Sequence, residues 1–114
     1  MEKHENFEIF DNIDVAITVC DVNFKIIYMN KKAIKTFEKY GDRIGKNLLE
    51  CHNENSKEKL ITMMEKAQKN TYTISKNGVK KIIHQTPWFL NGKIAGLIEF
   101  SIEIPENMEH FDRN

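Results

Sequence analysis

The sequence predicts an α+β fold in which a helical block separates two groups of antiparallel strands. Two runs rich in β-branched and aromatic residues, 16–21 and 25–30, come first. A helical pattern over 56–69 follows, and then three strand-like stretches joined by the hairpin signals Asn77-Gly78 and Asn91-Gly92. Strands grouped on either side of helices are typical of domains with an antiparallel sheet. A chain of 114 residues has the length of one domain.

The N-terminal part predicts a short helix and then a hairpin. Phe7 and Phe10 lie three residues apart within 5–12, which places them on one face of a helix, and Ile13 follows. Turn-forming residues in Asp21-Val-Asn-Phe24 separate the first two strands. Asn30 ends the second strand, and its side-chain oxygen is expected to cap the next helix.

That next helix is expected to run from Lys31 to Tyr40, with Gly41 as its stop. Residues 42–50 predict one or two further helical turns. Asn55, with Glu58 three residues later, is the expected N-cap of the long helix over 56–69. An apolar stripe at helical spacing defines the buried face of that helix: Leu60, Ile61, Met63, Met64 and Ala67.

The remaining chain predicts three strands, over 71–75, 79–90 and 93–104. Pro87 lacks a backbone donor, so we expect its end of the strand to lie at an edge or a bulge. The last strand alternates apolar residues with Glu99, Ser101 and Glu103, and this alternation predicts that the apolar residues face the core. Pro105 ends the strand.

Composition excludes several classes of protein. Seventeen acidic and 17 basic residues give a formal net charge of zero, so no global field favours nucleic acid or an anionic membrane. No apolar run approaches the roughly 20 residues that cross a bilayer, and the N-terminus lacks the apolar core of a secretion signal. We therefore expect a cytoplasmic protein. Cys20 and Cys51 are too few for a four-thiolate metal site or a disulfide framework.

No pattern of residues predicts an enzyme. Cys51 and His52 are adjacent, but a thiolate–imidazole pair needs a third group that orients the base, and none is evident. The carboxylates show no acid–base pairing, and a Gly-rich phosphate loop is missing. His52 is either a polar loop residue or an axial haem ligand. His84 and Trp88 share one strand face and either contact a ligand or serve the sheet.

The order of these elements resembles that of PAS domains over about residues 12–105. The resemblance is carried by the following residues: Asp21, Ile26-Ile-Tyr-Met-Asn30, Ala33, Gly45-Lys46-Asn47-Leu48, Asn77-Gly78, Gly96 and Ile98. It implies five antiparallel strands with helices packed on one face around a small cavity, and a role in sensing or protein interaction. Leu49-Glu-Cys-His52 is similar to a PAS subgroup, and the chain resembles small free-standing bacterial PAS proteins. The implied division is a helical cap at 1–14, a PAS domain at 15–105 and a tail at 106–114.

The resemblance also implies where a ligand and a second copy would bind. From the helical layer, the expected cavity residues are Phe37, Leu49, His52, Leu60, Met63 and Met64. From the sheet they are Ile17, Val19, Tyr72, Ile74, His84 and Ile98, although a slip of one residue exchanges the two faces of a strand. A homodimer is expected through Phe7, Phe10, Ile13 and Trp88.

Three functions fit these observations. The first is a sensor that binds a small ligand and signals through association with a copy of itself or with a separate signalling protein. The second is an interaction module with a filled core. The third is a haem-based gas or redox sensor that uses His52.

Overall fold

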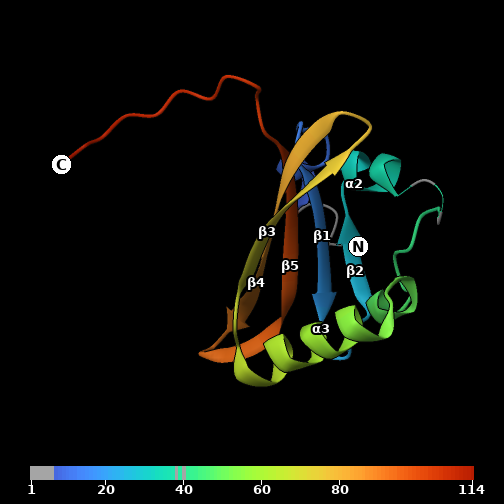
Figure 1. Cartoon of the computed structure of the whole chain (residues 1–114). Coiled ribbons are helices and arrows are strands. Elements are labelled where there is room, and N and C mark those ends of the chain that lie inside the picture. The colour runs from blue at the N-terminus through green and yellow to red at the C-terminus, as the bar shows by residue number, and fades with distance from the viewer. Residues whose placement is uncertain (1–6, 38, 40) are drawn as a thin grey trace.

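The computed structural model describes residues 7–37, 39 and 41–114. Its centre is a five-stranded antiparallel sheet with the strand order β2-β1-β5-β4-β3, which confirms the predicted fold class (Figure 1). The strands are β1 (Ala16–Asp21), β2 (Ile26–Met29), β3 (Asn70–Lys76), β4 (Val79–Leu90) and β5 (Lys93–Glu103). Asn77-Gly78 and Asn91-Gly92 connect the last three strands, and all four residues have the positive φ angles that tight hairpin turns require.

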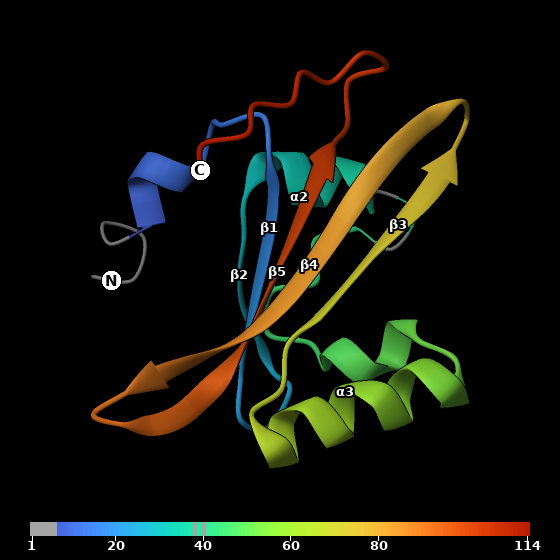
Figure 2. The same cartoon turned by 60° about the vertical axis from the view of Figure 1, so that its left-hand side comes forward.

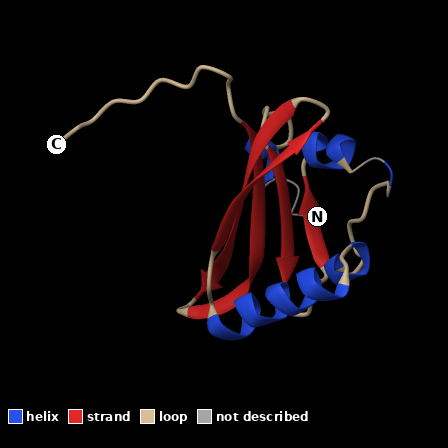
Figure 3. Ribbon diagram, in the orientation of Figure 1, coloured by secondary structure: helices blue, strands red, loops and turns tan. Residues whose placement is uncertain are grey.

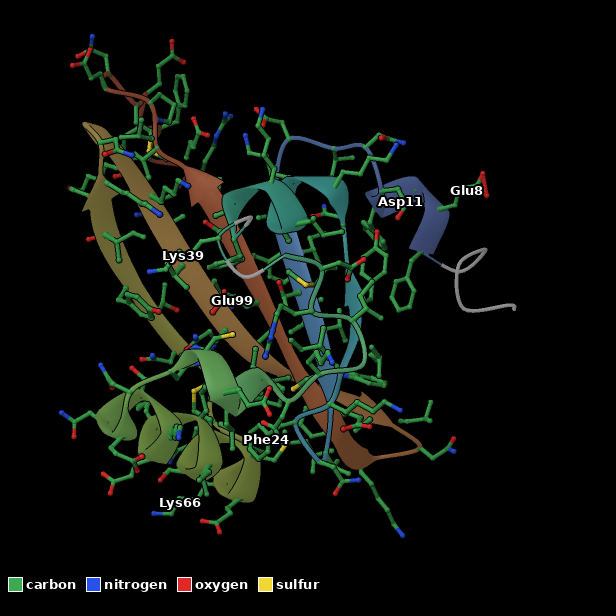
Figure 4. All side chains as sticks on the ribbon, turned by 90° about the vertical axis from the view of Figure 1, so that its right-hand side faces the viewer. Glu8, Asp11, Phe24, Lys39, Lys66 and Glu99 are labelled. Carbon is green, nitrogen blue, oxygen red and sulfur yellow. The ribbon has the colours of Figure 1, made fainter. Side chains whose placement is uncertain are left out.

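Three helices form one layer on one face of the sheet, as Figures 3 and 4 show: α2 (Lys31–Thr36), η3 (Leu48–Cys51) and α3 (Glu54–Lys66). The short helix η1 (Glu8–Phe10) lies outside this layer, beyond the edge strand β2 and near the end of the sheet where α2 begins (Figure 2). None of the described helices is long and apolar enough to cross a membrane.

The Asn30 side chain caps α2 and also binds three backbone groups elsewhere in the chain. Its side-chain oxygen accepts hydrogen bonds from the backbone of Ala33 and Ile17, both at 3.0 Å. Its amide nitrogen donates to the carbonyl oxygens of Phe10 at 2.9 Å and Val15 at 2.7 Å. The predicted cap is confirmed, and because Asn30 is only 1% exposed, it also fixes α2 against β1 and the N-terminal segment.

Several predicted helix boundaries were wrong. α2 ends at Thr36 rather than at Tyr40, and Glu38 and Tyr40 lie outside the described residues. The Thr36 hydroxyl donates to the carbonyl of Lys32 at 2.8 Å, a back-bond that weakens a helix. Of the helix predicted over 5–12, the described residues contain only η1, since residues 1–6 are not described.

The long helix is capped by Asn53 and not by Asn55. The Asn53 side chain accepts a hydrogen bond from the backbone of Ser56 at 2.9 Å. The helix ends at Lys66 rather than at Lys69, because Ala67 adopts a left-handed conformation and Asn70 already pairs with Gln85 in the sheet.

The core facing the helices has two parts. Cys20 and Leu97 pack against Leu60, Met63 and Met64 of α3. Nearer α2, a second cluster joins the sheet to this helix, and it consists of Ala16, Ile26, Met29 and Ala33.

The opposite face of the sheet, called here the outer face, has its own apolar cluster. Its buried residues are Ile17, Val19 and Tyr28, against which Phe7, Val15, Ile27, Trp88, Ile98 and Phe100 pack. Phe7 stacks on the Tyr28 ring with a centroid distance of 4.3 Å, and the Tyr28 hydroxyl donates to the Asp11 carboxylate. Ile17, Val19 and Ile98 thus lie on the face opposite to the one that we predicted, because the alternation of inward and outward residues along β1 and β5 is shifted by one residue from the expected one.

Trp88 links three strands across the outer face. Its indole nitrogen donates to the carbonyl of Cys20 at 3.0 Å, and Gly96 lies between these two groups in the pairing of β4, β5 and β1. A Cβ atom on Gly96 would lie 1.8 Å from that carbonyl oxygen, so only glycine fits here. As predicted for Pro87, the ladder of β4 is irregular nearby, with a register shift between Trp88 and Phe89.

Candidate ligand-binding cavity

A cavity of about 310 Å³ lies between the helical layer and the sheet face that it covers, within the range of small-molecule sites. Every layer of the fold contributes to its wall. The lining residues are Thr18, Ile26, Met29, Thr36, Phe37, Lys39, Arg43, Leu48, Cys51, His52, Lys76 and Glu99.

The segment between α2 and η3 closes one side of this cavity by pairing with the edge of β2. The backbone nitrogen of Gly45 donates to the carbonyl of Ile26 at 2.7 Å, and the nitrogen of Ile26 donates to Lys46 at 2.8 Å. A further bond runs from Leu48 to the carbonyl of Phe24, also at 2.7 Å. Gly45 has a φ of +90°, a conformation that glycine adopts readily. These bonds place Arg43 and Leu48 at the wall.

Glu99 is an acidic group in this mostly apolar space. It stands on β5 opposite Thr18 of β1, and Figure 4 shows it between α2 and α3, below the loop with Lys39. Its carboxylate accepts a hydrogen bond from the Gln85 side chain at 2.7 Å, and Gln85 in turn accepts one from Asn70 at 3.2 Å. Burial raises the pKa of Glu99, against the smaller opposing effects of Gln85 and His52.

His52 is held by its own backbone turn. Its Nδ1 lies 2.9 Å from the carbonyl oxygen of Leu48, and since a carbonyl only accepts, Nδ1 carries the hydrogen. The Nε2 atom therefore remains the second hydrogen-bonding position of the ring. His52 also lines a neighbouring groove of about 270 Å³ between α3 and β3, with Tyr72 and Gln85 among its other walls.

Arg43 is one of three basic residues in the wall, with Lys39 and Lys76. Its Nη2 atom pairs with the Glu50 carboxylate at 2.7 Å. The Nε–H group of the same guanidinium is buried and has no hydrogen-bond partner among the described residues. A buried donor without a partner is unfavourable by about 1–3 kcal/mol, so an acceptor placed beside it would be bound favourably.

Two of the predicted cavity residues, Phe37 and His52, line the cavity. Leu60, Met63 and Met64 belong instead to the filled core beside it, and Leu49 packs on the same cluster. In β3, whose partner β4 lies on one side only, Tyr72 faces the groove and Ile74 is 37% exposed.

His84 lies away from the cavity. It pairs with Thr71, whose hydroxyl is 2.7 Å from its Nδ1, and with Phe100 of the outer-face cluster. This placement favours the interpretation of His84 and Trp88 as residues of the sheet, and Ile98 shares their face.

Sequence reasoning missed most of the polar wall, including Thr18, Arg43 and Glu99. Glu99 alternates with isoleucines and phenylalanine in β5, and we interpreted those apolar residues as inward-facing. The reverse is observed: Leu97, Glu99 and Ser101 face the helices. Leu97 could have indicated this, because Leu97 and Ile98 are adjacent apolar residues and so break the strict alternation of the strand.

The predicted dimer residues gather at the outer face and beside it. Phe7 and Trp88 pack on the outer-face cluster. Phe10 and Ile13 are 38% and 39% exposed.

The cavity of about 310 Å³ is small for a haem, which has dozens of non-hydrogen atoms. In the described part of the chain, no three His, Cys, Asp or Glu side chains are grouped so that they could hold a metal ion.

Burial raises the pKa of the Cys20 thiol to about 11, so this cysteine is unreactive at neutral pH.

Comparisons with known proteins agree with this architecture. A family model described as "PAS domain" matches residues 5–68. Among solved structures, the PAS domain of BvgS from Bordetella pertussis has 17% identity and a TM-score of 0.64, covering 93% of this chain and 89% of that one. No curated protein matched.

A second similar structure is the VqmA dimer of Vibrio cholerae, with 19% identity and a TM-score of 0.67. The match covers 90% of this chain but 51% of VqmA, so the chain spans about half of that protein. A structure of VqmA bound to DPO matches with a TM-score of 0.65 and 19% identity, over 88% of this chain and 57% of that one.

Proposed function

The chain belongs to the PAS domain family, and on this premise we propose that it is a non-catalytic sensor domain whose cavity binds a small ligand and whose outer sheet face carries the signal to a partner. PAS domains generally serve signalling. The observation that carries the proposal is the cavity itself, which combines apolar walls with a few polar groups: Glu99, His52 and the Arg43 guanidinium. We place this activity in the cytoplasm, without nucleic acid or membrane as a partner.

The ligand half of the proposal is tested by mass spectrometry of small molecules released from the purified, denatured protein. Thr18 lines the cavity and is 8% exposed, so Thr18→Leu fills part of the space. Thr73 is exposed on β3 and faces away from the helices, so Thr73→Leu is the matched control. We expect a stoichiometric small molecule from the parent and from Thr73→Leu, and its loss from Thr18→Leu. A parent that releases nothing, and that binds nothing from a fragment library, would favour the interaction module instead.

The association half of the proposal rests on the apolar outer face. Ile102 is 39% exposed on this face, where it continues the row of the half-buried Ile98 and Phe100 along β5. VqmA, which shares this fold, is described as a dimer. We propose a homodimer through this face and the N-terminal Phe7, Phe10 and Ile13.

Light scattering tests the dimer against the 13.4 kDa mass of one chain. Ile102→Glu places a charge within the proposed contact and should yield monomers. Ile61→Glu makes the same change at a 38% exposed site on α3 and should leave the dimer intact. A parent of monomer mass would reject self-association, and the signal would then require a separate signalling protein.

A further inference from the structure

We infer that the ligand of this cavity is a small amphoteric molecule of about ten non-hydrogen atoms in total, with a nitrogen donor that binds the Glu99 carboxylate, an oxygen acceptor that binds the Arg43 Nε–H, and an apolar remainder. This inference rests on the proposed function and adds the chemical class of the ligand.

The nitrogen donor follows from the unused capacity of Glu99. A carboxylate offers about four acceptor positions, and Glu99 receives one hydrogen bond, from Gln85. It forms no ion pair within the described part of the chain. A buried carboxylate without a hydrogen-bonded cation is unfavourable, and a protonated nitrogen offsets that cost better than a hydroxyl does.

The oxygen acceptor follows from Arg43. Glu50 pairs with its Nη2 atom, so Arg43 itself does not require a further full anion. The Nε–H group still needs an acceptor, which a carbonyl or carboxylate oxygen of the ligand supplies.

The size and the apolar body follow from the remaining walls. Ile26, Met29, Phe37 and Leu48 line the same cavity as these two polar groups. A volume of 310 Å³ holds a molecule of the size of an apolar amino acid and lies at the lower end of the range of small-molecule sites.

Three matched probes separate the two groups of the ligand. L-leucine carries nitrogen and carboxylate on an apolar body, 3-methylbutylamine carries only the nitrogen, and 4-methylpentanoate carries only the carboxylate. Each is titrated at up to millimolar concentration into ligand-free protein, and binding is followed by heteronuclear NMR shifts of residues around the cavity. We expect leucine to bind most tightly of the three.

Two variants test which protein side chain binds each polar group of the ligand. Glu99→Gln keeps the shape and the acceptor for Gln85, and should weaken leucine and the amine about 10-fold or more while sparing the acid. Arg43→Lys removes the Nε–H and should weaken leucine and the acid only. Glu65→Gln, at an exposed position of α3, is the control and should change nothing.

The inference is overturned if 4-methylpentanoate binds as tightly as leucine, if Glu99→Gln leaves amine binding unchanged, or if none of the three probes binds. These results do not decide the proposed function, which depends on the molecule released from the parent protein. A co-purified molecule without nitrogen would retain the sensor and reject this ligand class.

Discussion

At the scale of single residues, the buried acidic side chain of Glu99 distinguishes the cavity from the packed apolar core. A carboxylate on the covered sheet face destabilises the ligand-free protein, because burial favours the protonated form and raises its pKa. Proteins retain such residues where function requires them, at the expense of stability. The charged and polar groups around Glu99 come from every neighbouring element: His52, Tyr72, Gln85, and the cavity cations Lys39, Arg43 and Lys76.

Glu99→Gln is therefore expected to stabilise the ligand-free protein in a pH-dependent way. Folded Glu99 binds its proton more tightly than unfolded Glu99, whose pKa is near 4.5, so the stability of the parent falls as pH rises from 4.5 through the raised folded pKa. The variant lacks this titration. Urea unfolding should show no gain for the variant near pH 4 and a gain that grows as the pH rises above 4.5, until the pH passes the folded pKa of Glu99. A constant difference between the two proteins at all pH values would contradict the assignment.

At the scale of elements, local signals predicted most of the fold. The Asn-Gly turns and the Asn30 cap depend on residues close in sequence, and both are confirmed. Of the predicted apolar stripe of α3, Leu60, Met63 and Met64 are buried, whereas Ile61 is 38% exposed and Ala67 is exposed just after the helix. Helix ends were less predictable, since they depend on competition between neighbours. Asn53 and Asn55 are chemically identical, and only the path of the chain after η3 selects Asn53 as the cap.

The two asparagines provide an element-scale prediction with an internal control. Asn53→Ala removes the side-chain acceptor for the Ser56 backbone and should lower the free energy of unfolding by about 1 kcal/mol. Asn55→Ala, at an exposed position inside the first turn, should change it by less than about 0.5 kcal/mol. Denaturant unfolding of both variants checks this. An equal loss from both would mean that the cap does not fix the start of α3.

At the scale of the whole molecule, the face of each strand was the least predictable property. In β5 the isoleucines and phenylalanine alternate with acidic and small residues, which by itself indicates an apolar inner face. The structure instead directs Leu97, Glu99 and Ser101 to the helices, while Ile98, Phe100 and Ile102 lie outside. Register depends on pairing with distant β1, and an alternation in one strand cannot show which face is covered when both are partly apolar.

The sheet face that the helices cover has two parts, a filled core and the cavity beside it. Helix α3 packs on the filled core. Met63 is 1% exposed and packs with Cys20, Leu60 and Leu97, none of which lines the cavity of about 310 Å³. Met63→Ala should therefore lower the free energy of unfolding by about 2–5 kcal/mol, as other truncations of packed core residues do.

Met63→Ala should bind the small molecule as tightly as the parent does, because the cavity wall is unchanged. The two affinities are compared well below the unfolding temperatures of both proteins. Thermal unfolding with and without the ligand checks both halves of this prediction, and the ligand should raise the midpoint of the variant as much as that of the parent. A small loss of stability together with a large loss of binding would mean that Met63 borders the ligand. The cavity would then extend along α3, and its centre would lie farther from Glu99 than we infer.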